Sequence, residues 1–264
     1  KSRDAAIIAR LKAQVIEKTT PLEVKSNLLH GFERIGGYQA QKDLFHRSIV
    51  LPLRNPDLAR EMGLALPRGD ILFGPPGTSK SIFAAALAKE LGLLFVRLSP
   101  EHFLGSLVGQ SERNLRDSIK TIEEMAPCVV FMEEGDRYGG RGAGGELDGG
   151  THERVFSQLL EWLGDSQRRS IVILNTNVPE RLDAAFSREG RFDARIPFLA
   201  PDAEGRKAIF KIHLETVRQV PHNLTERDLE DLAELTDLWK GNMIEELVKR
   251  ANRLAFVEAA TTAK

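Results

Sequence analysis

Short apolar runs alternate with longer amphipathic segments in the middle of the chain. The runs cover residues 71–73, 94–96, 129–132 and 171–174. Continuous apolar runs of this length indicate strands that are buried on both faces. The segments between them, at residues 81–91, 111–125 and 154–163, have the periodicity of helices. This alternation predicts an α/β fold built on a mostly parallel sheet.

Helical patterns flank this region on both sides. Residues 4–18 carry apolar side chains at helical spacing, and residues 41–50 form another helical stretch. Pro52, Pro56 and Pro67 interrupt the connection that follows. After Pro201 the strand pattern does not return, and the predicted helices lie at residues 204–216, 226–236 and 241–260. We therefore expect an N-terminal helical linker (1–30), an α/β domain (31–200) and a small all-helical domain (201–264). The linker helix either leads to a further domain or caps the core.

A glycine-rich loop joins the first predicted strand to the following helix. Backbone amides in such a loop, together with the helix N-terminus, present positive charge to phosphates. Lys80 can reach the β- and γ-phosphates of a nucleotide, and the Ser81 hydroxyl can bind Mg²⁺. Ser79 stands where this motif has glycine, and a positive φ there would cost roughly 1–2 kcal/mol. The alternative interpretation is a turn with a chance lysine. The loop residues are Gly74, Pro75, Pro76, Gly77, Thr78, Ser79, Lys80 and Ser81.

Two carboxylates, Glu133 and Glu134, follow the apolar run at residues 129–132. A nucleoside triphosphatase needs one carboxylate for the metal and another to orient the attacking water. Neighbouring residues at a strand end can point to different sides and divide these tasks. We assign the metal to Glu133 and the water to Glu134. Glu133 is longer than the usual Asp, and Mg²⁺ tolerates little change in geometry. The alternative is a solvated acidic turn.

Composition and charge narrow the classes of protein. The chain has 264 residues, of which 42% are hydrophobic, so a disordered chain is excluded. The 37 Lys and Arg residues balance 38 Asp and Glu residues, which argues against a dedicated nucleic-acid binder. The single cysteine, Cys128, excludes a disulfide scaffold and is expected to be an inert core thiol in a reducing, cytoplasmic compartment. No apolar run approaches the length of a membrane span, about 20 residues.

The order and separation of these motifs resemble the AAA clade of AAA+ ATPases, which contains the proteasomal ATPases, FtsH, katanin, spastin and valosin-containing protein. The strand-to-carboxylate segment 130–136 is similar to that family's. Residues 175–183 and 187–193 resemble its second region of homology, and residues 32–37 and 241–244 match its flanking motifs. The resemblance covers roughly residues 30–256. It implies a P-loop nucleotide-binding domain that is followed by a helical lid.

The resemblance also implies roles for residues outside the phosphate loop. Asn177 looks like the polar sensor beside the γ-phosphate and the attacking water. Arg188 and Arg191 look like arginine fingers, which in this family reach the nucleotide of the neighbouring subunit. A guanidinium supplied in this way stabilises charge in the transition state. The alternative for Arg188 is an ordinary surface arginine.

Further residues are implied as contacts of ATP. Ile35 and Gly36 resemble the segment whose backbone lies against adenine, and His213 resembles the lid histidine near the purine and ribose. Gly241 would let the lid helix approach the base closely. Asn242 replaces the usual small Ala. Ile82, at the start of the helix after the loop, completes the implied ATP-binding residues.

Two loops align with the loops that line the central pore in this family. Leu107, followed by Val108, stands where many threading members carry an aromatic residue. Leucine offers an apolar contact of smaller area. The second loop, residues 139–150, has seven glycines in twelve residues. For each loop, a segment without a substrate role is the alternative.

These observations together predict an ATP-hydrolysing AAA module, with ATP and Mg²⁺ as cofactors. We expect it to work as a homo-oligomeric, hexameric ring that remodels or unfolds a protein substrate, engaged through an N-terminal domain or adaptor outside this sequence. The alternative is a nucleotide-dependent assembly module with weak or no hydrolysis, which the departures at Ser79 and Glu133 suggest. A nucleic-acid loader or helicase is disfavoured, and neither nucleic acid nor a membrane segment is expected.

Overall fold

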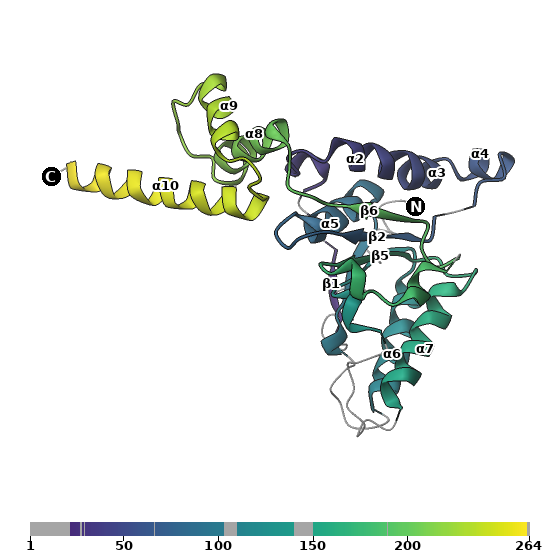
Figure 1. Ribbon diagram of the computed structural model, residues 1–264. Helices are drawn as coiled ribbons and strands as arrows, with labels where there is room; N and C mark the ends of the chain where they lie inside the picture. Colours follow the sequence, from purple (N-terminus) through teal and green to yellow (C-terminus); the bar gives the residue numbers. More distant parts are fainter. Residues whose placement is uncertain are drawn as a thin grey trace.

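The computed structural model describes residues 22–26, 28, 30–65, 67–102, 110–139, 150–188 and 190–262. A central sheet lies between layers of helices (Figure 1). It has six strands in the order β1-β3-β4-β5-β2-β6. All neighbouring pairs are parallel except β1 with β3. The predicted α/β fold with a mostly parallel sheet is therefore confirmed. The strands are β1 (Glu23–Lys25), β2 (Gly69–Phe73), β3 (Leu94–Leu98), β4 (Cys128–Met132), β5 (Ile171–Thr176) and β6 (Ala194–Pro197).

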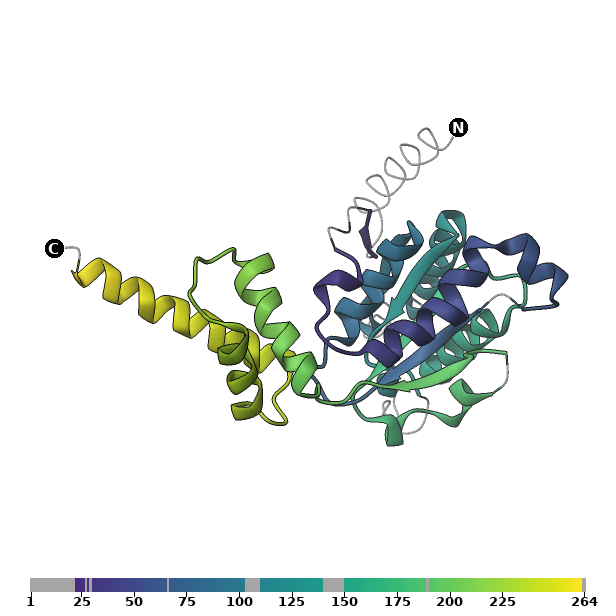
Figure 2. The ribbon, with the colours of Figure 1, turned by 90° about the horizontal axis from the view of Figure 1, so that it is seen from above.

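Helices cover both faces of the sheet (Figures 1 and 2). On one face lie α2 (Gln39–Phe45), the π-helix η2 (His46–Val50) and α5 (Lys80–Leu91), around a core that includes Phe83 and Phe131. On the other face lie α6 (Gln110–Met125) and α7 (Thr151–Gly164), around Val130 and Leu159. Because both faces of the central strands are buried, these strands appear in the sequence as unbroken apolar runs.

The edges of the sheet carry two strands that the apolar runs did not predict. Residues 23–25, which we assigned to a helical linker, form β1 and pair with β3. Val24 is buried while its neighbours face outward, so one side chain anchors this strand. On the opposite edge, β6 pairs with β2, and Ile196 is its buried residue. Both strands are too short to show a clear alternation.

The proline-rich connection after η2 is more helical than expected. It contains α3 (Leu51–Arg54) and α4 (Pro56–Glu61), each with a proline in its first two positions. Proline is well suited there because its missing amide would have no partner inside the helix. The short 3₁₀ helices are η1 (Phe32–Arg34), η3 (Pro100–His102), η4 (Gly135–Arg137), η5 (Pro179–Arg181) and η6 (Ala184–Ser187).

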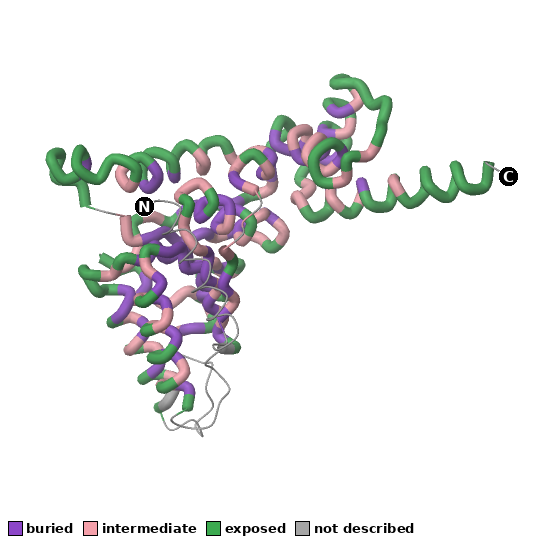
Figure 3. The backbone as a smooth tube through the Cα atoms, turned by 180° about the vertical axis from the view of Figure 1, so that it is seen from behind, coloured by how far each residue is buried: buried purple, intermediate pink, exposed green. Residues whose placement is uncertain are grey.

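The C-terminal part is entirely helical and is called the lid below. It consists of α8 (Ala203–Lys211), the π-helix η7 (Ile212–Val217), α9 (Glu226–Leu235) and α10 (Gly241–Thr262). The lid has its own small core of Ile209, Phe210, Leu214, Leu229, Ile244 and Val248. The outer half of α10 projects away from this core and is exposed (Figures 2 and 3).

The topology brings the candidate chemistry to one edge of the sheet. The phosphate loop follows β2, Glu133 follows β4, and Asn177 follows β5. The carboxyl ends of parallel strands meet at the same edge, which is where open α/β sheets bind ligands. Three predicted features lie outside the described residues. They are the helix at 4–18, the pore residues Leu107 and Val108, and residues 140–149 of the second loop.

Candidate nucleotide-binding site

The phosphate loop is anchored on the strand beside it. The Gly74 amide donates a hydrogen bond to the Thr176 carbonyl of β5, with 3.3 Å between nitrogen and oxygen. Thr78 and Lys80 are almost fully buried, with 1% and 5% of their surface exposed. The Thr78 hydroxyl donates to the Pro75 carbonyl at 2.9 Å. The loop is therefore tightly packed, and it is held by a hydrogen bond to β5 and by one within the loop itself.

The loop presents amides that have no partner in the protein. Within the described residues, the amides of Gly77, Thr78 and Ser79 donate no hydrogen bond. The first amides of α5 follow directly, and the amides of a first helical turn have no carbonyl partner within the helix. A run of free donors beside a helix N-terminus attracts anions, since amides and helix dipole both favour negative charge.

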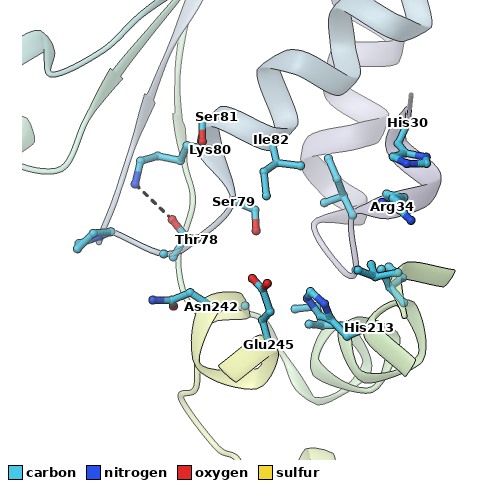
Figure 4. Close-up of a pocket in the computed structure, with 18 of the residues that line it drawn as sticks. His30, Arg34, Thr78, Ser79, Lys80, Ser81, Ile82, His213, Asn242 and Glu245 are labelled. Atoms are coloured by element: carbon cyan, nitrogen blue, oxygen red, sulfur yellow. Dashed lines mark hydrogen bonds between the residues drawn. The ribbon is translucent and has the colours of Figure 1, made fainter. Parts of the chain in front are cut away.

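Lys80 places a positive charge inside this loop. Its ammonium donates to the carbonyls of Gly74 and Pro75, at 2.7 and 2.8 Å, and lies 3.3 Å from the Thr78 hydroxyl (Figure 4). All three acceptors are neutral oxygens. Burial lowers the pKa of Lys80 to about 8, and the positive charge of Lys240 contributes. An anion bound here would supply the missing negative charge.

Ser79 adopts the left-handed backbone conformation that glycine normally provides. Its φ is +63° and its ψ is +18°. Side chains raise the energy of this conformation by roughly 1–2 kcal/mol. The fold therefore tolerates the departure from the glycine pattern, and the serine hydroxyl occupies space beside the lid.

A pocket of about 540 Å³ opens between the phosphate loop, the segment around Ile35 and the lid (Figure 4). This volume suits a small-molecule ligand. Most residues that we expected to contact ATP line it. They are Ile35, Gly36, Pro76, Gly77, Thr78, Ser79, Lys80, Ser81, Ile82, Asn177, His213, Gly241 and Asn242. Gly74 and Pro75, at the start of the loop, do not line the pocket, and their carbonyls accept hydrogen bonds from the Lys80 ammonium instead.

The lid touches the phosphate loop closely. A Cβ atom on Gly77 would lie 2.3 Å from the Asn242 side-chain oxygen, and one on Gly241 would lie 3.4 Å from the Ser79 hydroxyl. Asn242 and Ser79, the two residues that depart from the usual Ala and Gly, thus line the same contact between loop and lid. Gly241 and Asn242 are the first residues of α10, so the N-terminus of this helix lies beside the loop and adds to the attraction of the loop for anions.

At the opposite end of the pocket, the segment around Gly36 packs against the lid. A Cβ atom on Gly36 would lie 2.5 Å from the Ile209 side chain, so only glycine allows this segment to pack on α8. His213 lies on η7, and burial lowers the pKa of its imidazole. Its Nδ1 is buried and has no hydrogen-bond partner in the described chain. A neutral imidazole and apolar side chains form a suitable surface for a flat heterocycle.

Four further polar residues line the pocket and were not predicted: His30, Arg34, Asn175 and Glu245. Arg34 immediately precedes Ile35, so its position could have been inferred, whereas His30 lies five residues before Ile35. Arg34 donates from Nη2 to the Thr216 carbonyl of the lid at 3.1 Å. Glu245 lies one helical turn after Asn242, and Asn175 lies two residues before Asn177, so each could have been found by its periodicity.

The acidic strand end lies outside the lining of this pocket. Both oxygens of Glu133 already have partners: Oε1 accepts from Arg97 at 3.0 Å and Oε2 accepts from Ser99 at 2.9 Å. Glu134 has left-handed backbone angles, with φ +51° and ψ +53°, and its carboxylate pairs with Arg137. The two glutamates therefore diverge, as their adjacent positions predicted.

Asn177 does line the pocket, just beyond the end of β5. The preceding residue fixes the strand end, because the Thr176 hydroxyl bonds the Asp136 carboxylate at 2.7 Å and accepts the Val178 amide at 3.1 Å. This arrangement links the end of β5 to the turn that carries Glu134.

The two predicted arginine fingers follow the short helix η6. Arg188 is exposed and does not line the pocket. Arg191 is half-buried, and its guanidinium donates to the Ala185 carbonyl. Burial lowers the pKa of Arg191, and the nearby positive charge of Arg188 contributes. The structure therefore does not bring these arginines to the pocket of their own chain.

The candidate ligands for a metal ion are few in the described part of the chain. Among the described residues, no cluster of three or more His, Cys, Asp or Glu side chains is placed to hold one. Ser81 lines the pocket, and Glu133 stands at the end of β4. One hydroxyl and one carboxylate suit Mg²⁺, which takes few protein ligands and completes its shell with phosphates and water.

Comparisons with known proteins agree with this geometry. Residues 71–199 match the family described as "ATPase family associated with various cellular activities (AAA)". The chain is 39% identical over 223 residues to the cell division cycle protein 48 homolog of Archaeoglobus fulgidus, covering 83% of this chain and 30% of that protein. It is 35% identical over 241 residues to the proteasome-activating nucleotidase of Methanococcus vannielii, covering 90% and 57%.

A third relative is the ATP-dependent zinc metalloprotease FtsH of Lancefieldella parvula, with 37% identity over 192 residues, or 72% of this chain and 30% of that protein. The chain thus spans between 30% and 57% of the length of these relatives. In the described part of the chain, no helix combines the length and apolar character needed to cross a membrane.

Proposed function

Because the chain belongs to the AAA family of ATPases, we propose that it binds ATP in the pocket between the phosphate loop and the lid and hydrolyses it there. One observation carries this proposal above the others. The free amides of the phosphate loop and the buried Lys80 ammonium converge on one pocket, which needs a polyanion to balance it. A triphosphate supplies that charge.

The pocket suggests how the nucleotide lies. The phosphate oxygens accept hydrogen bonds from the amides of Gly77, Thr78 and Ser79, and the charge of Lys80 neutralises the β- and γ-phosphates. The base lies at the other end, against Ile35, Gly36 and His213. The lid residues Gly241 and Asn242 cover the phosphates. Their close contact with the phosphate loop supports this placement.

Mg²⁺ is the second proposed cofactor, with Ser81 and Glu133 as its protein ligands. The ion would offset negative charge on the β- and γ-phosphates during phosphoryl transfer. The pocket position of Ser81 supports this assignment. The contacts of Glu133 with Arg97 and Ser99 keep its carboxylate at a defined place beside the end of β4.

Glu134 and Asn177 are the proposed partners of the attacking water. Glu134 accepts the proton or orients the water, and Asn177 contacts the γ-phosphate beside it. In the structure Glu134 pairs with Arg137, so its carboxylate must turn from that exposed partner to reach a bound nucleotide. An exposed ion pair is weak, typically below about 1 kcal/mol, and would oppose this rotation only slightly.

Assembly into a homo-oligomeric ring, most simply a hexamer, is part of the proposal. Arg188 and Arg191 are placed after η6, away from the pocket of their own chain, which suits a role at a neighbour's nucleotide. An arginine supplied by a neighbour can raise the rate by about 10³–10⁵. Within each subunit, we propose an ATPase domain at 31–200, a lid domain at 201–264 and a linker at 1–30.

We further propose that the ring remodels or unfolds proteins in the cytoplasm. The relative from Methanococcus vannielii is named a proteasome-activating nucleotidase, which supports a protein-directed role for this module. Substrate would be engaged through a domain or adaptor outside this sequence, and Leu107 and Val108 would contact it in the pore. The balanced charge of the chain supports a protein rather than a nucleic-acid substrate.

A second candidate function is a nucleotide-dependent assembly module with little hydrolysis. The specific observation in its favour is that both oxygens of Glu133 are engaged by Arg97 and Ser99, while Ser79 strains the loop. Phosphate release by concentrated protein separates the two functions. A rate equal to that of Arg188→Ala would favour the assembly module.

The direct test of hydrolysis is Glu134→Gln. We expect it to lower turnover by at least about 100-fold, because general-base catalysis contributes roughly 10²–10⁴ in rate. ATP affinity, measured with a fluorescent nucleotide, should stay within about twofold, since Glu134 does not line the pocket. Glu180→Gln, the same change at an exposed position on η5, is the matched control. Turnover of Glu134→Gln at the wild-type rate would contradict the assignment.

A further inference from the structure

The edge strand β1 pairs with β3, and β3 pairs with β4, the strand that ends just before Glu133. In the antiparallel pair, Glu23 of β1 stands directly opposite Arg97 of β3. In the parallel pair, Arg97 stands opposite Phe131 of β4, and Glu133 comes two residues later. Because side chains alternate along strands, Glu23, Arg97 and Glu133 lie on the same face of the sheet.

Arg97 joins the two carboxylates on either side of it. Its Nη1 donates to Glu23 Oε2 at 2.9 Å, and its Nη2 donates to Glu133 Oε1 at 3.0 Å. Ser99 donates to the other oxygen of Glu133 at 2.9 Å. The contacts therefore run without a gap from β1, across β3, to the carboxylate that follows β4. We call Glu23, Arg97 and Glu133 the edge bridge.

The geometry of Arg97 couples the positions of the two carboxylates in the edge bridge. A guanidinium is planar and holds its donors in a fixed fork, so moving one carboxylate turns the donor that faces the other. The three side chains are 38%, 34% and 25% exposed, so each is shielded in part from solvent. Partial shielding strengthens charge interactions relative to those in bulk water.

The charges in the edge bridge determine how it affects a cation. Arg97 alone beside Glu133 would orient the carboxylate and also repel Mg²⁺. Glu23, whose other oxygen pairs with the exposed Lys25 at 2.7 Å, offsets part of that positive charge, and so it favours a cation at Glu133. By the reciprocity of linked equilibria, a cation at Glu133 must then favour the contact between Arg97 and Glu23.

We propose that Arg97 is a positioning residue for the metal-binding carboxylate of Glu133, and that Glu23 links the docking of β1 to the binding of Mg²⁺ with the nucleotide. The inference rests on the proposed role of Glu133 as a metal ligand. The N-terminal segment that contains β1 is thereby coupled to the metal site. Undocking of β1 from the sheet edge weakens Mg²⁺ binding, and bound Mg²⁺ stabilises the docked strand.

The first experiment measures equilibrium binding rather than turnover. Fluorescent ADP is titrated at a series of Mg²⁺ concentrations, which gives the Mg²⁺ concentration at half of the full metal-dependent gain in affinity. Glu23→Gln should raise this midpoint by about threefold or more, mainly since Arg97 loses the contact that fixes its fork against Glu133, and in smaller part since its charge is less well balanced beside the metal. Affinity in EDTA should not change. Glu258→Gln, which alters net charge equally on the exposed outer half of α10, should leave the midpoint unchanged.

Repeating the change in a second background tests the route through Arg97. Arg97→Lys keeps the charge but loses the fork that holds both carboxylates. In this background Glu23→Gln should shift the midpoint by less than half as much, on a logarithmic scale, as it does in the wild-type protein. An equal shift in both backgrounds would show that Glu23 acts by general charge, and would overturn the edge bridge.

Hydrogen exchange provides a readout that does not depend on a variant. Amides at residues 23–25 should exchange more slowly with Mg²⁺ and ADP than with ADP in EDTA, because a bound cation favours β1 docking. Unchanged exchange in the wild-type protein, or a Glu23→Gln midpoint equal to the wild-type value, would overturn the inference and leave the proposed ATPase function standing. Nucleotide binding that does not depend on Mg²⁺ at all would overturn both.

Discussion

The two sides of the candidate site differ in how complete they are within one chain. On the loop side, segments distant in the sequence, from Ile35 to Asn242, line a single pocket with free amides and a buried lysine. On the hydrolytic side, Glu133 and Glu134 face Arg97 and Arg137, and Arg188 points to solvent. In the proposed function, a single chain thus provides the residues that hold the nucleotide, while hydrolysis also requires Mg²⁺ and an arginine from a neighbouring subunit.

The largest effect on the loop side should come from Lys80→Met. The variant removes the buried cation and, with it, charge-assisted hydrogen bonds that contribute about 1.5–3 kcal/mol each. We expect ATP affinity to fall by about 100-fold or more in a fluorescence titration. Lys89→Met, on the exposed side of the same helix, is the matched control and should bind ATP normally. Retained affinity in Lys80→Met would mean that the loop is not the phosphate site.

The pH dependence of nucleotide binding should show a smaller effect at the same residue. Burial lowers the pKa of Lys80 to about 8, so the free protein loses this charge above that pH. A phosphate requires the charged form, and binding then takes up a proton. ATP affinity should be nearly constant below pH 8 and should fall above it, by up to about tenfold per pH unit. Titrations from pH 7 to 9.5 measure this slope.

The Lys80→Met variant is also the control for that slope. Its weak residual binding should not change in this way above pH 8, because the titrating group is absent. An equal slope in the variant and the wild-type protein would assign the pH dependence to another group.

The stability of the protein without nucleotide should change with pH in the opposite direction. Because the pKa of Lys80 is lowered in the folded state, the unfolded chain binds more protons between pH 8 and about 10.5. This group therefore increases the free energy of unfolding as pH rises through that window.

Among changes on the loop side, Ser79→Gly should have the smallest effect, and it should act on the stability of the fold. Glycine removes the cost of the left-handed conformation at φ +63° but also makes the unfolded chain more flexible. We expect a net gain of about 0.5–1 kcal/mol in the free energy of unfolding, measured by denaturant titration. Gln219→Gly, at φ +49° on the exposed surface, should give a similar gain. A loss of stability in Ser79→Gly would show that the serine hydroxyl contributes more than the strain costs.

The difference between the two sides also explains what the sequence could predict. The phosphate loop is continuous, so its residue types reveal its chemistry, and the unusual Ser79 was visible before its φ was known. The central strands were predictable because burial on both faces leaves unbroken apolar runs. Cys128 was expected in the core, where burial raises the pKa of its thiol to about 12.

Other features depend on contacts between distant segments. Strand β1 has three residues and exists because β3 offers an open edge, which no local pattern shows. Arg34 and Glu245 lie close in the sequence to the predicted contacts Ile35 and Asn242, but they line one pocket only because the lid packs against the loop. The contacts of Glu133 with Arg97 and Ser99 likewise follow from strand order, which the sequence indicated only as a mostly parallel sheet.

Hydrolysis, as proposed, needs groups from two subunits, and mixing two inactive variants shows whether it does. Glu134→Gln and Arg188→Ala should each be nearly inactive alone, because one lacks the water-orienting group and the other lacks the arginine. Mixed in equal amounts and allowed to exchange subunits, they should form a wild-type pair of these groups at about a quarter of the sites. Steady-state phosphate release should then rise well above that of either variant. If the mixture is no more active than its components while subunit exchange is verified, Arg188 does not act on a neighbour's nucleotide and the proposed need for two subunits is wrong.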